Sequence, residues 1–251
     1  MSYYETDEQV DQYMEFHYGD TWLSVANYPK ACAEHCLALM AQAGLAQEQP
    51  KRALDLGCAV GRTSLELALA FEEVVAVDLS QRFIQQAQQL QSEGSDGYFR
   101  RYQGELGQTR QVDLAALGLQ EAASRVTFAQ GDAGNLDPQF GAFDLVFAGN
   151  LIDRLPDPGQ FLRQIKQHVR PGGLLVISSP YTLLTDFTPR EKWIGGFMAG
   201  EQEVTMLDGM GACLEPWFEP VSKPVDLPFV IRETGRKFQH SFAQLSAWRR
   251  F

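Results

Sequence analysis

Short apolar runs alternate with amphipathic stretches through the middle of the chain. The apolar runs predict strands at residues 52–56, 73–78, 126–129, 143–148 and 174–178. Between them, apolar side chains at helical spacing predict helices over 63–71, 81–91 and 159–168, and the Pro-Gly-Gly at 171–173 ends the last of these. This alternation is typical of an α/β fold with a mostly parallel sheet and helices on both faces.

Two stretches interrupt the alternation and are predicted to be insertions. The first, at about 92–124, is far longer than an ordinary connection, and we expect a hairpin in its first half and a helix over 114–123. The second, at about 180–208, contains Thr188-Pro189-Arg190-Glu191, which has the form of a capping box. It predicts a short helix through Trp193, in a segment placed to act as a lid or substrate wall.

The two ends of the chain form further units. In residues 1–44, Val10, Tyr13 and Phe16 fall on one face of a helix opened by Thr6 or Asp7, and a second helix is expected over 29–43. These helices are predicted to form a lid packed on the domain of residues 45–251. Strand-like runs on either side of a turn predict an antiparallel hairpin over 229–251, at the edge of the sheet.

Composition and charge narrow the function. The 251 residues carry a net charge of −11 with a pI near 4.8, which argues against nucleic-acid partners and anionic membrane surfaces. The acidic start lacks the pattern of a secretory signal, so we expect a soluble cytoplasmic protein. Its four cysteines are then reduced thiols. Cys32 and Cys36 lie one helical turn apart, but no second ligand pair follows, so no metal site is predicted.

A glycine loop follows the first predicted strand, in Asp55-Leu56-Gly57-Cys58-Ala59-Val60-Gly61. Gly57 allows a ligand to approach the backbone, and Gly61 allows the next helix to pack closely. The loop departs from the dinucleotide fingerprint, because Cys58-Ala59 stands where the second glycine is needed. The acid before the first glycine instead suits a ligand with an ammonium group.

Polar residues also follow the next three strands. Asp78 is placed to accept both hydroxyls of a ribose, Asp132 to read an adenine amino group, and Asn150 follows the fourth strand. Each acid has an alternative interpretation as a helix cap. Because the carboxyl ends of parallel strands meet at one edge of the sheet, these residues are predicted to share a ligand crevice.

This combination resembles the class I S-adenosylmethionine-dependent methyltransferases over residues 45–251. A narrower resemblance covers nearly the whole chain, in the segments YYETDEQVDQYMEFHYG, NYPKAC, ALDLGCAVGR, NLIDRL, SPYTLLTDFTPREKW and LPFVIRETGRKFQHS. These are similar to the methyltransferases of ovothiol biosynthesis, which methylate a ring nitrogen of 5-thiohistidine (4-mercaptohistidine) to give ovothiol A. That family occurs fused behind a sulfoxide synthase or free-standing. The resemblance implies the free-standing form, with a separate sulfoxide synthase as its functional partner.

The resemblance also implies where S-adenosylmethionine binds. The carried-over positions are Asp55, Gly57, Ala59, Gly61, Asp78, Asp132, Ala133 and Asn150, together with His17 and Tyr18 of an HYG element over the methionine end. We place their neighbours Tyr13, Leu56, Cys58, Leu79, Phe83 and Leu151 in the same site.

The substrate needs donors for its carboxylate, an acceptor for its ammonium group and aromatic walls. The basic candidates are Arg154, Arg190, Lys192 and Arg232, the acidic ones Asp153, Glu215 and Glu233, and the aromatic ones Tyr3, Tyr4, Tyr181, Trp193 and Phe229; Asn150 also faces this site. The catalytic candidates are His17, Tyr18, Asn150 and Asp153, and a base, if one is needed, is His17, Asp153 or His240.

Two other functions remain open on the sequence. One is a class I methyltransferase of another small thiol, imidazole or amino acid. The other is a non-catalytic S-adenosylmethionine-binding partner of a sulfoxide synthase.

Overall fold

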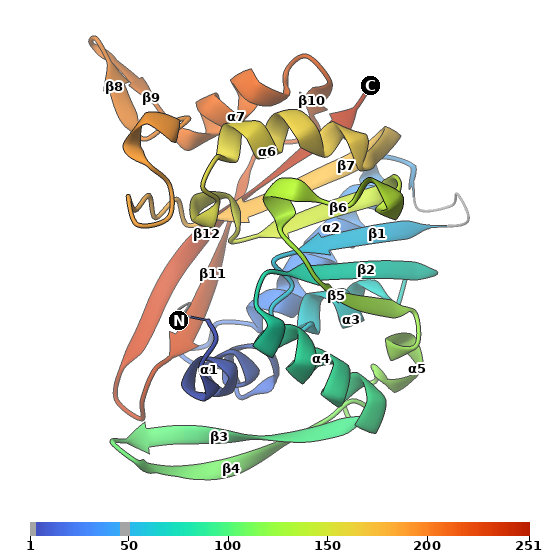
Figure 1. The fold of residues 1–251 in the computed structure, drawn as a ribbon, viewed down its shortest axis with the longest axis vertical. Helices are drawn as coiled ribbons and strands as arrows, with labels where there is room; N and C mark the ends of the chain where they lie inside the picture. The colour runs from blue at the N-terminus through green and yellow to red at the C-terminus, as the bar shows by residue number, and fades with distance from the viewer. Residues whose placement is uncertain (1–3, 46–50) are drawn as a thin grey trace.

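A computed structural model describes residues 4–45 and 51–251, which fold around one mixed sheet (Figure 1). The strand order is β10-β12-β7-β6-β1-β2-β5, and β11 pairs with β12. The bounds are β1 (Arg52–Leu56), β2 (Glu73–Asp78), β5 (Val126–Gln130), β6 (Phe143–Gly149), β7 (Val169–Ser179), β10 (Phe218–Pro220), β11 (Val225–Arg232) and β12 (Phe238–Arg250). The five central strands are parallel and β12 is antiparallel to β7, so the predicted sheet is confirmed.

Helices cover both faces of this sheet. On one side lie α3 (Arg62–Leu67) and α4 (Gln81–Glu93), and on the other lie α6 (Pro158–Gln164) and α7 (Met206–Leu214) (Figure 1). The alternation of side chains along β2 explains why: Val74 and Ala76 belong to the first core, and Val75 and Val77 to the second. Strands buried on both faces read as unbroken apolar runs, which is what the sequence shows.

The N-terminal helices share the first of these cores. They are α1 (Asp7–Tyr18), whose N-cap Thr6 accepts from the Gln9 amide at 3.3 Å, and α2 (Tyr28–Gln42), capped in the same way by Asn27. Met14 of α1 and Cys32 of α2 are fully buried in this core. The helices predicted near the N-terminus are therefore present and packed on the sheet.

The first insertion forms the predicted hairpin, β3 (Ser95–Gln103) and β4 (Leu106–Asp113), beneath α1 and α4 (Figure 1). The helix expected over 114–123 is wrong for most of its length, because only α5 (Gln120–Ala123) is helical. The Asp113 carboxylate accepts from the amides of Ala115 and Ala116, and Gly118 has a φ of +72°. Both features close turns that break the helix.

The second insertion corrects another expectation. Thr188 caps no helix, because its hydroxyl donates to the Leu155 carbonyl at 2.6 Å, and only a 3-10 turn, η6 (Arg190–Lys192), follows. A complete capping box lies further on, at Thr205 and Asp208, and opens α7. Between them, β8 (Phe197–Ala199) and β9 (Gln202–Val204) form a separate hairpin.

Several boundaries also differ from the prediction. The first helix after the glycine loop ends at Leu67, α6 passes into the 3-10 turn η5 (Ile165–Gln167), and β7 begins at Val169 through an irregular stretch of pairing. The C-terminal hairpin begins at Val225, and β10 shares the outer edge of β12 with β11. The other 3-10 turns are η2 (Ala133–Asn135), η3 (Pro138–Phe140) and η4 (Ile152–Arg154). No helix in the described ranges is long and apolar enough to cross a membrane.

Candidate functional site

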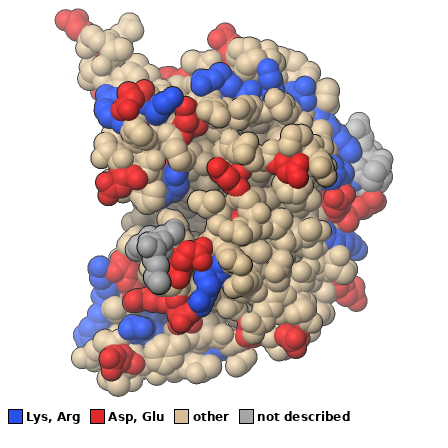
Figure 2. All heavy atoms as spheres, viewed as in Figure 1, with Lys and Arg blue, Asp and Glu red and all other residues tan. Residues whose placement is uncertain are grey.

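A cavity of about 390 Å³ opens at the carboxyl ends of β1, β2, β5 and β6, beneath the N-terminal helices. The space-filling view shows the surface hollowed on the side where Figure 1 places α1 below and the second insertion above (Figure 2). Most of the predicted cofactor residues line this cavity: Tyr13, His17, Asp55, Gly57, Cys58, Ala59, Asp78, Leu79, Phe83, Asp132, Ala133, Asn150 and Leu151. The topology thus brings together residues that are spread from the first helix to the fourth parallel strand.

The glycine loop is held in a left-handed conformation. Gly57 has a φ of +74° and Ala59 a φ of +46°, and the Ala59 amide donates to the Asp78 carboxylate at 2.9 Å. A Cβ on Gly61 would lie 2.6 Å from the Phe128 ring. Gly61 therefore allows close packing and lies outside the cavity lining, as does Leu56, which is fully buried in the opposite core.

Acidic groups dominate the charged part of the lining. Asp55 is 1% exposed and accepts from the Ser64 hydroxyl at 2.6 Å. Burial, with Asp78 nearby, raises the pKa of Asp55 to about 7. Asp132 caps η2 through the Gly134 amide, which confirms the interpretation as a cap; it also lines the cavity, and its contact with an adenine amino group stays a prediction. Together with Glu5, these acids suit a ligand that carries positive charge.

His17 faces the cavity, whereas Tyr18 lies behind the loop. The Nδ1 atom of His17 accepts from the Arg62 amide at 3.4 Å. Burial and the Arg62 charge lower the His17 pKa to about 3, which makes the ring a neutral and weak base. The Tyr18 hydroxyl donates to the Val60 carbonyl at 2.8 Å, so this side chain braces the loop and lies outside the cavity lining.

At the end of β6, Arg154 lines the cavity and Asp153 does not. Among the cavity-lining residues that the structure describes, Arg154 is the only Lys or Arg. Its guanidinium lies 4.8 Å from the Phe187 ring and donates to the Asp153 carboxylate at 2.9 Å. Asp153 is 1% exposed and also accepts from Ser179. Asp153 therefore holds Arg154, and the role predicted for it at the substrate is corrected.

Of the remaining substrate candidates, Tyr4 lines the cavity, and those of the second insertion do not. Lys192 pairs with Asp157 at 2.8 Å, and the Arg190 guanidinium lies 4.8 Å from the Trp193 ring. The Trp193 indole donates to the Thr188 carbonyl. Arg190 and Trp193 therefore contact each other and Lys192 contacts the N-cap of α6, and all three lie outside the cavity lining.

Further candidates also fall outside the cavity lining. The Tyr181 hydroxyl donates to Gln244, Phe229 is buried, and Glu233 pairs with Lys237. Glu215 and His240 are exposed elsewhere, and Tyr3 lies outside the described residues.

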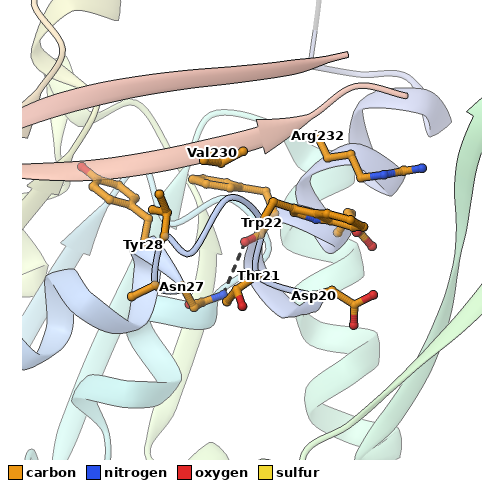
Figure 3. A pocket seen from close by; sticks show the side chains of 11 residues that line it. Asp20, Thr21, Trp22, Asn27, Tyr28, Val230 and Arg232 are labelled. Carbon is orange, nitrogen blue, oxygen red and sulfur yellow. Dashed lines mark hydrogen bonds between the residues drawn. The ribbon is translucent and has the colours of Figure 1, made fainter. Parts of the chain in front are cut away.

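Arg232 lines a separate cavity of about 20 Å³ below β11 (Figure 3). Its guanidinium donates to the Arg101 carbonyl at 2.8 Å and lies 5.5 Å from the Trp22 ring. Phe16 and Tyr28 line both cavities and so form the wall between them. This wall places Arg232 apart from the cofactor residues and corrects its predicted role.

Several cavity-lining residues were missed by the sequence interpretation. They are mostly apolar or aromatic: Phe16, Tyr28, Cys32, Thr63, Phe147, Phe187 and Ile231, with Glu5. Thr63 and Phe147 look like ordinary core positions, whereas the other six lie in the segments that resemble ovothiol methyltransferases, and that resemblance was the available signal. Among the described residues, no group of three His, Cys, Asp or Glu side chains could hold a metal ion.

Comparisons with known proteins agree with this geometry. Residues 54–177 match the family described as "Methyltransferase domain". Ajmaline N-methyltransferase of Rauvolfia serpentina is 28% identical over 182 residues, which cover 72% of this chain and 51% of that protein. The chain thus spans about half the length of this curated relative.

Two solved structures share the fold. Magnesium protoporphyrin IX methyltransferase from Synechocystis PCC 6803, with S-adenosylhomocysteine bound, aligns with a TM-score of 0.59 and 19% identity over 99% of this chain and 97% of that one. An N-methyltransferase from Bradyrhizobium japonicum, also with S-adenosylhomocysteine, aligns with a TM-score of 0.54 and 16% identity over 98% and 99%. Residues 54–177 are therefore similar to a methyltransferase domain, in a chain that shares the Rossmann-like fold of these two structures.

Proposed function

We propose that this protein is an S-adenosylmethionine-dependent N-methyltransferase that converts 5-thiohistidine to ovothiol A. The observation that carries the proposal is where the segments resembling ovothiol methyltransferases lie in the fold. They contribute Tyr13 and His17 from α1, Tyr28 from α2, Arg154 after β6, Phe187 from the second insertion and Ile231 from β11, and all of these line one cavity. Because these segments are far apart in sequence, their convergence supports a shared role.

The cavity residues fit the cofactor in charge and shape. Asp78, at the end of β2, would hold the ribose hydroxyls, and Asp55 the ammonium group of the methionine end. Leu79, Phe83 and Ala133 offer apolar surface for the adenine. When bound, this cofactor supplies an electrophilic methyl group on a positively charged sulfur.

The same cavity offers one partner for the substrate carboxylate. Arg154 is held by Asp153 and by the Thr182 carbonyl, which fix its guanidinium beside the cavity. Its pairing with a substrate carboxylate would orient the imidazole ring toward the methyl group. The Phe187 ring beside it adds an apolar wall.

Methyl transfer then needs little acid–base chemistry from the protein. A lone pair on the ring nitrogen of the substrate forms the new N–C bond while the bond between the methyl group and the cofactor sulfur breaks. The electron pair of the broken bond stays on the cofactor sulfur. The imidazolium formed loses its N–H proton to water. A low His17 pKa is consistent with this route, because the neutral ring orients groups rather than accepting that proton.

The test is turnover of 5-thiohistidine against a panel. The purified chain is incubated with S-adenosylmethionine and 5-thiohistidine, histidine, or unrelated small thiols and amino acids, and kcat/KM is compared. We expect 5-thiohistidine to be preferred by at least tenfold. Preference for another acceptor would indicate a different small-molecule methyltransferase, and cofactor binding without any turnover would favour the non-catalytic partner of a sulfoxide synthase.

A further inference from the structure

Tyr28 reaches from the start of α2 to the carboxyl ends of two central strands. Its hydroxyl donates to Asn150 Oδ1 at 2.9 Å and lies 2.8 Å from Ser178 Oγ. The side chain is 5% exposed, and its ring packs against Phe16 and Phe229, with centroids 6.0 and 5.0 Å apart. A hydroxyl held this firmly fixes the groups that it contacts.

The group that it fixes is the Asn150 side-chain amide. The Asn150 backbone is left-handed, with a φ of +49°, and the backbone N–H of Asn150 donates to the Ser178 carbonyl at 2.8 Å. Because Oδ1 accepts from Tyr28, the Nδ2 group occupies the other branch of the amide plane. No group in the described part of the chain accepts from Nδ2, and Asn150 lines the cavity. Two N–H donors are therefore available to a ligand.

A cavity with this lining is short of donors for a substrate anion. Its charged side chains are mainly carboxylates, namely Glu5, Asp55, Asp78 and Asp132, and Arg154 is assigned above to the substrate carboxylate. The proposed substrate carries a second anion, its thiolate, which is the stronger nucleophile of the two competing atoms. Attack by that sulfur would form an S–CH3 bond while the same methyl–sulfur bond of the cofactor breaks.

We propose that Tyr28 is a positioning residue that holds the Asn150 amide as a hydrogen-bond donor to the substrate sulfur, and that this pair selects nitrogen over sulfur as the methyl acceptor. The inference rests on the proposed function. An N–H donor on the thiolate holds the sulfur away from the methyl group and weakens its lone pairs as nucleophiles. Ser178 supports the arrangement, because its hydroxyl is placed to donate to the Tyr28 oxygen.

Two isosteric changes separate the elements of this arrangement. Asn150→Asp keeps an acceptor for Tyr28 but replaces the N–H donors with a second oxygen. Tyr28→Phe keeps the packed ring but leaves the amide free to rotate. Tyr102→Phe is the matched control, since its side chain is 46% exposed on the β3–β4 hairpin, away from the cavity.

Binding without turnover gives the first readout. In the presence of S-adenosylhomocysteine, calorimetry measures the affinity for 5-thiohistidine and for histidine, which lacks the sulfur. We expect Asn150→Asp and Tyr28→Phe to weaken 5-thiohistidine binding at least tenfold and fivefold, with histidine binding changed less than twofold. Equal losses for both ligands would overturn the inference, because the amide would then contact something other than the sulfur.

The ratio of N-methyl to S-methyl product gives the second readout. We expect it to fall at least tenfold in Asn150→Asp and severalfold in Tyr28→Phe, and to be unchanged in Tyr102→Phe. Ratios equal to wild type in both variants would refute the inference while leaving the proposed function intact. A wild-type protein that methylates no 5-thiohistidine would overturn both.

Discussion

Asp55 should make cofactor affinity depend on pH near neutrality. Burial raises its pKa to about 7 in the ligand-free protein. An ammonium group held against it would stabilise the ionised form and lower that pKa again. Proton binding then competes with the cofactor, so affinity should be constant above pH 7 and fall about tenfold for each pH unit below it.

Calorimetry with S-adenosylhomocysteine between about pH 5.5 and 8.5 measures this dependence. Asp55→Asn is the matched control, because it keeps the side-chain shape and cannot ionise. Subtracting its profile cancels the titration of the ligand and of other groups. We expect the variant to bind about 10- to 100-fold more weakly at pH 8, and the difference to shrink as the pH falls. Parallel profiles for the two proteins would refute the role given to Asp55.

The same carboxylate should make folded stability fall as the pH rises, in contrast to the affinity for the cofactor, which should increase. An acid whose pKa is raised in the folded state binds its proton more tightly there than in the unfolded chain. Folded stability therefore decreases as the pH rises from about 4 to 7 and stays lower above that range. Without ligand, the melting temperature of Asp55→Asn relative to wild type should be higher at pH 8 than at pH 4.

Three further changes test other parts of the site. Arg154→Ala should raise the KM for 5-thiohistidine about tenfold or more, because it removes a charge-assisted hydrogen bond of about 1.5–3 kcal/mol. Arg190→Ala is the control and should leave KM within twofold, since the Arg190 side chain lies outside the cavity lining. Steady-state kinetics that reverse this order would exclude Arg154 as the carboxylate partner. Asp78→Ala should weaken cofactor binding by about 1–3 kcal/mol in calorimetry, and unchanged affinity would remove it from the site. Gly61→Ala should destabilise the fold by about 2–4 kcal/mol in urea unfolding, because its Cβ would meet Phe128. Gly104→Ala is the control and should cost about 1 kcal/mol, since Gly104 has a φ of +55° but open space around it. Equal losses would mean that packing at Gly61 is unimportant.

Much of the sheet could be predicted, because its strands are buried on both faces and read as apolar runs. The residues at the carboxyl ends of those strands were also predictable, since parallel topology carries Asp55, Asp78 and Asn150 to one edge whatever the loops do. Helix ends were less predictable. The hydroxyl of Thr188 has the right spacing for a cap, yet a tertiary hydrogen bond to Leu155 takes it.

The substrate side depends on contacts that sequence spacing does not contain. Arg154 and Arg190 are equivalent candidates in the sequence, and only the packing of the second insertion decides which of them lines the cavity. Arg232 is separated from the cofactor residues by Phe16 and Tyr28, two side chains that come from different helices. Tyr28 itself reads as a helix N-terminus, and its contact with Asn150 joins residues 122 positions apart.

The most direct test of the central claim is the position of the transferred methyl group. S-adenosylmethionine with a trideuterated methyl is incubated with the protein and 5-thiohistidine, and the product is analysed by NMR and fragment mass spectrometry. We expect the label on a ring nitrogen, with the sulfur free to react with a thiol reagent. Label on the sulfur, or its absence from any product while the cofactor still binds, would contradict this expectation.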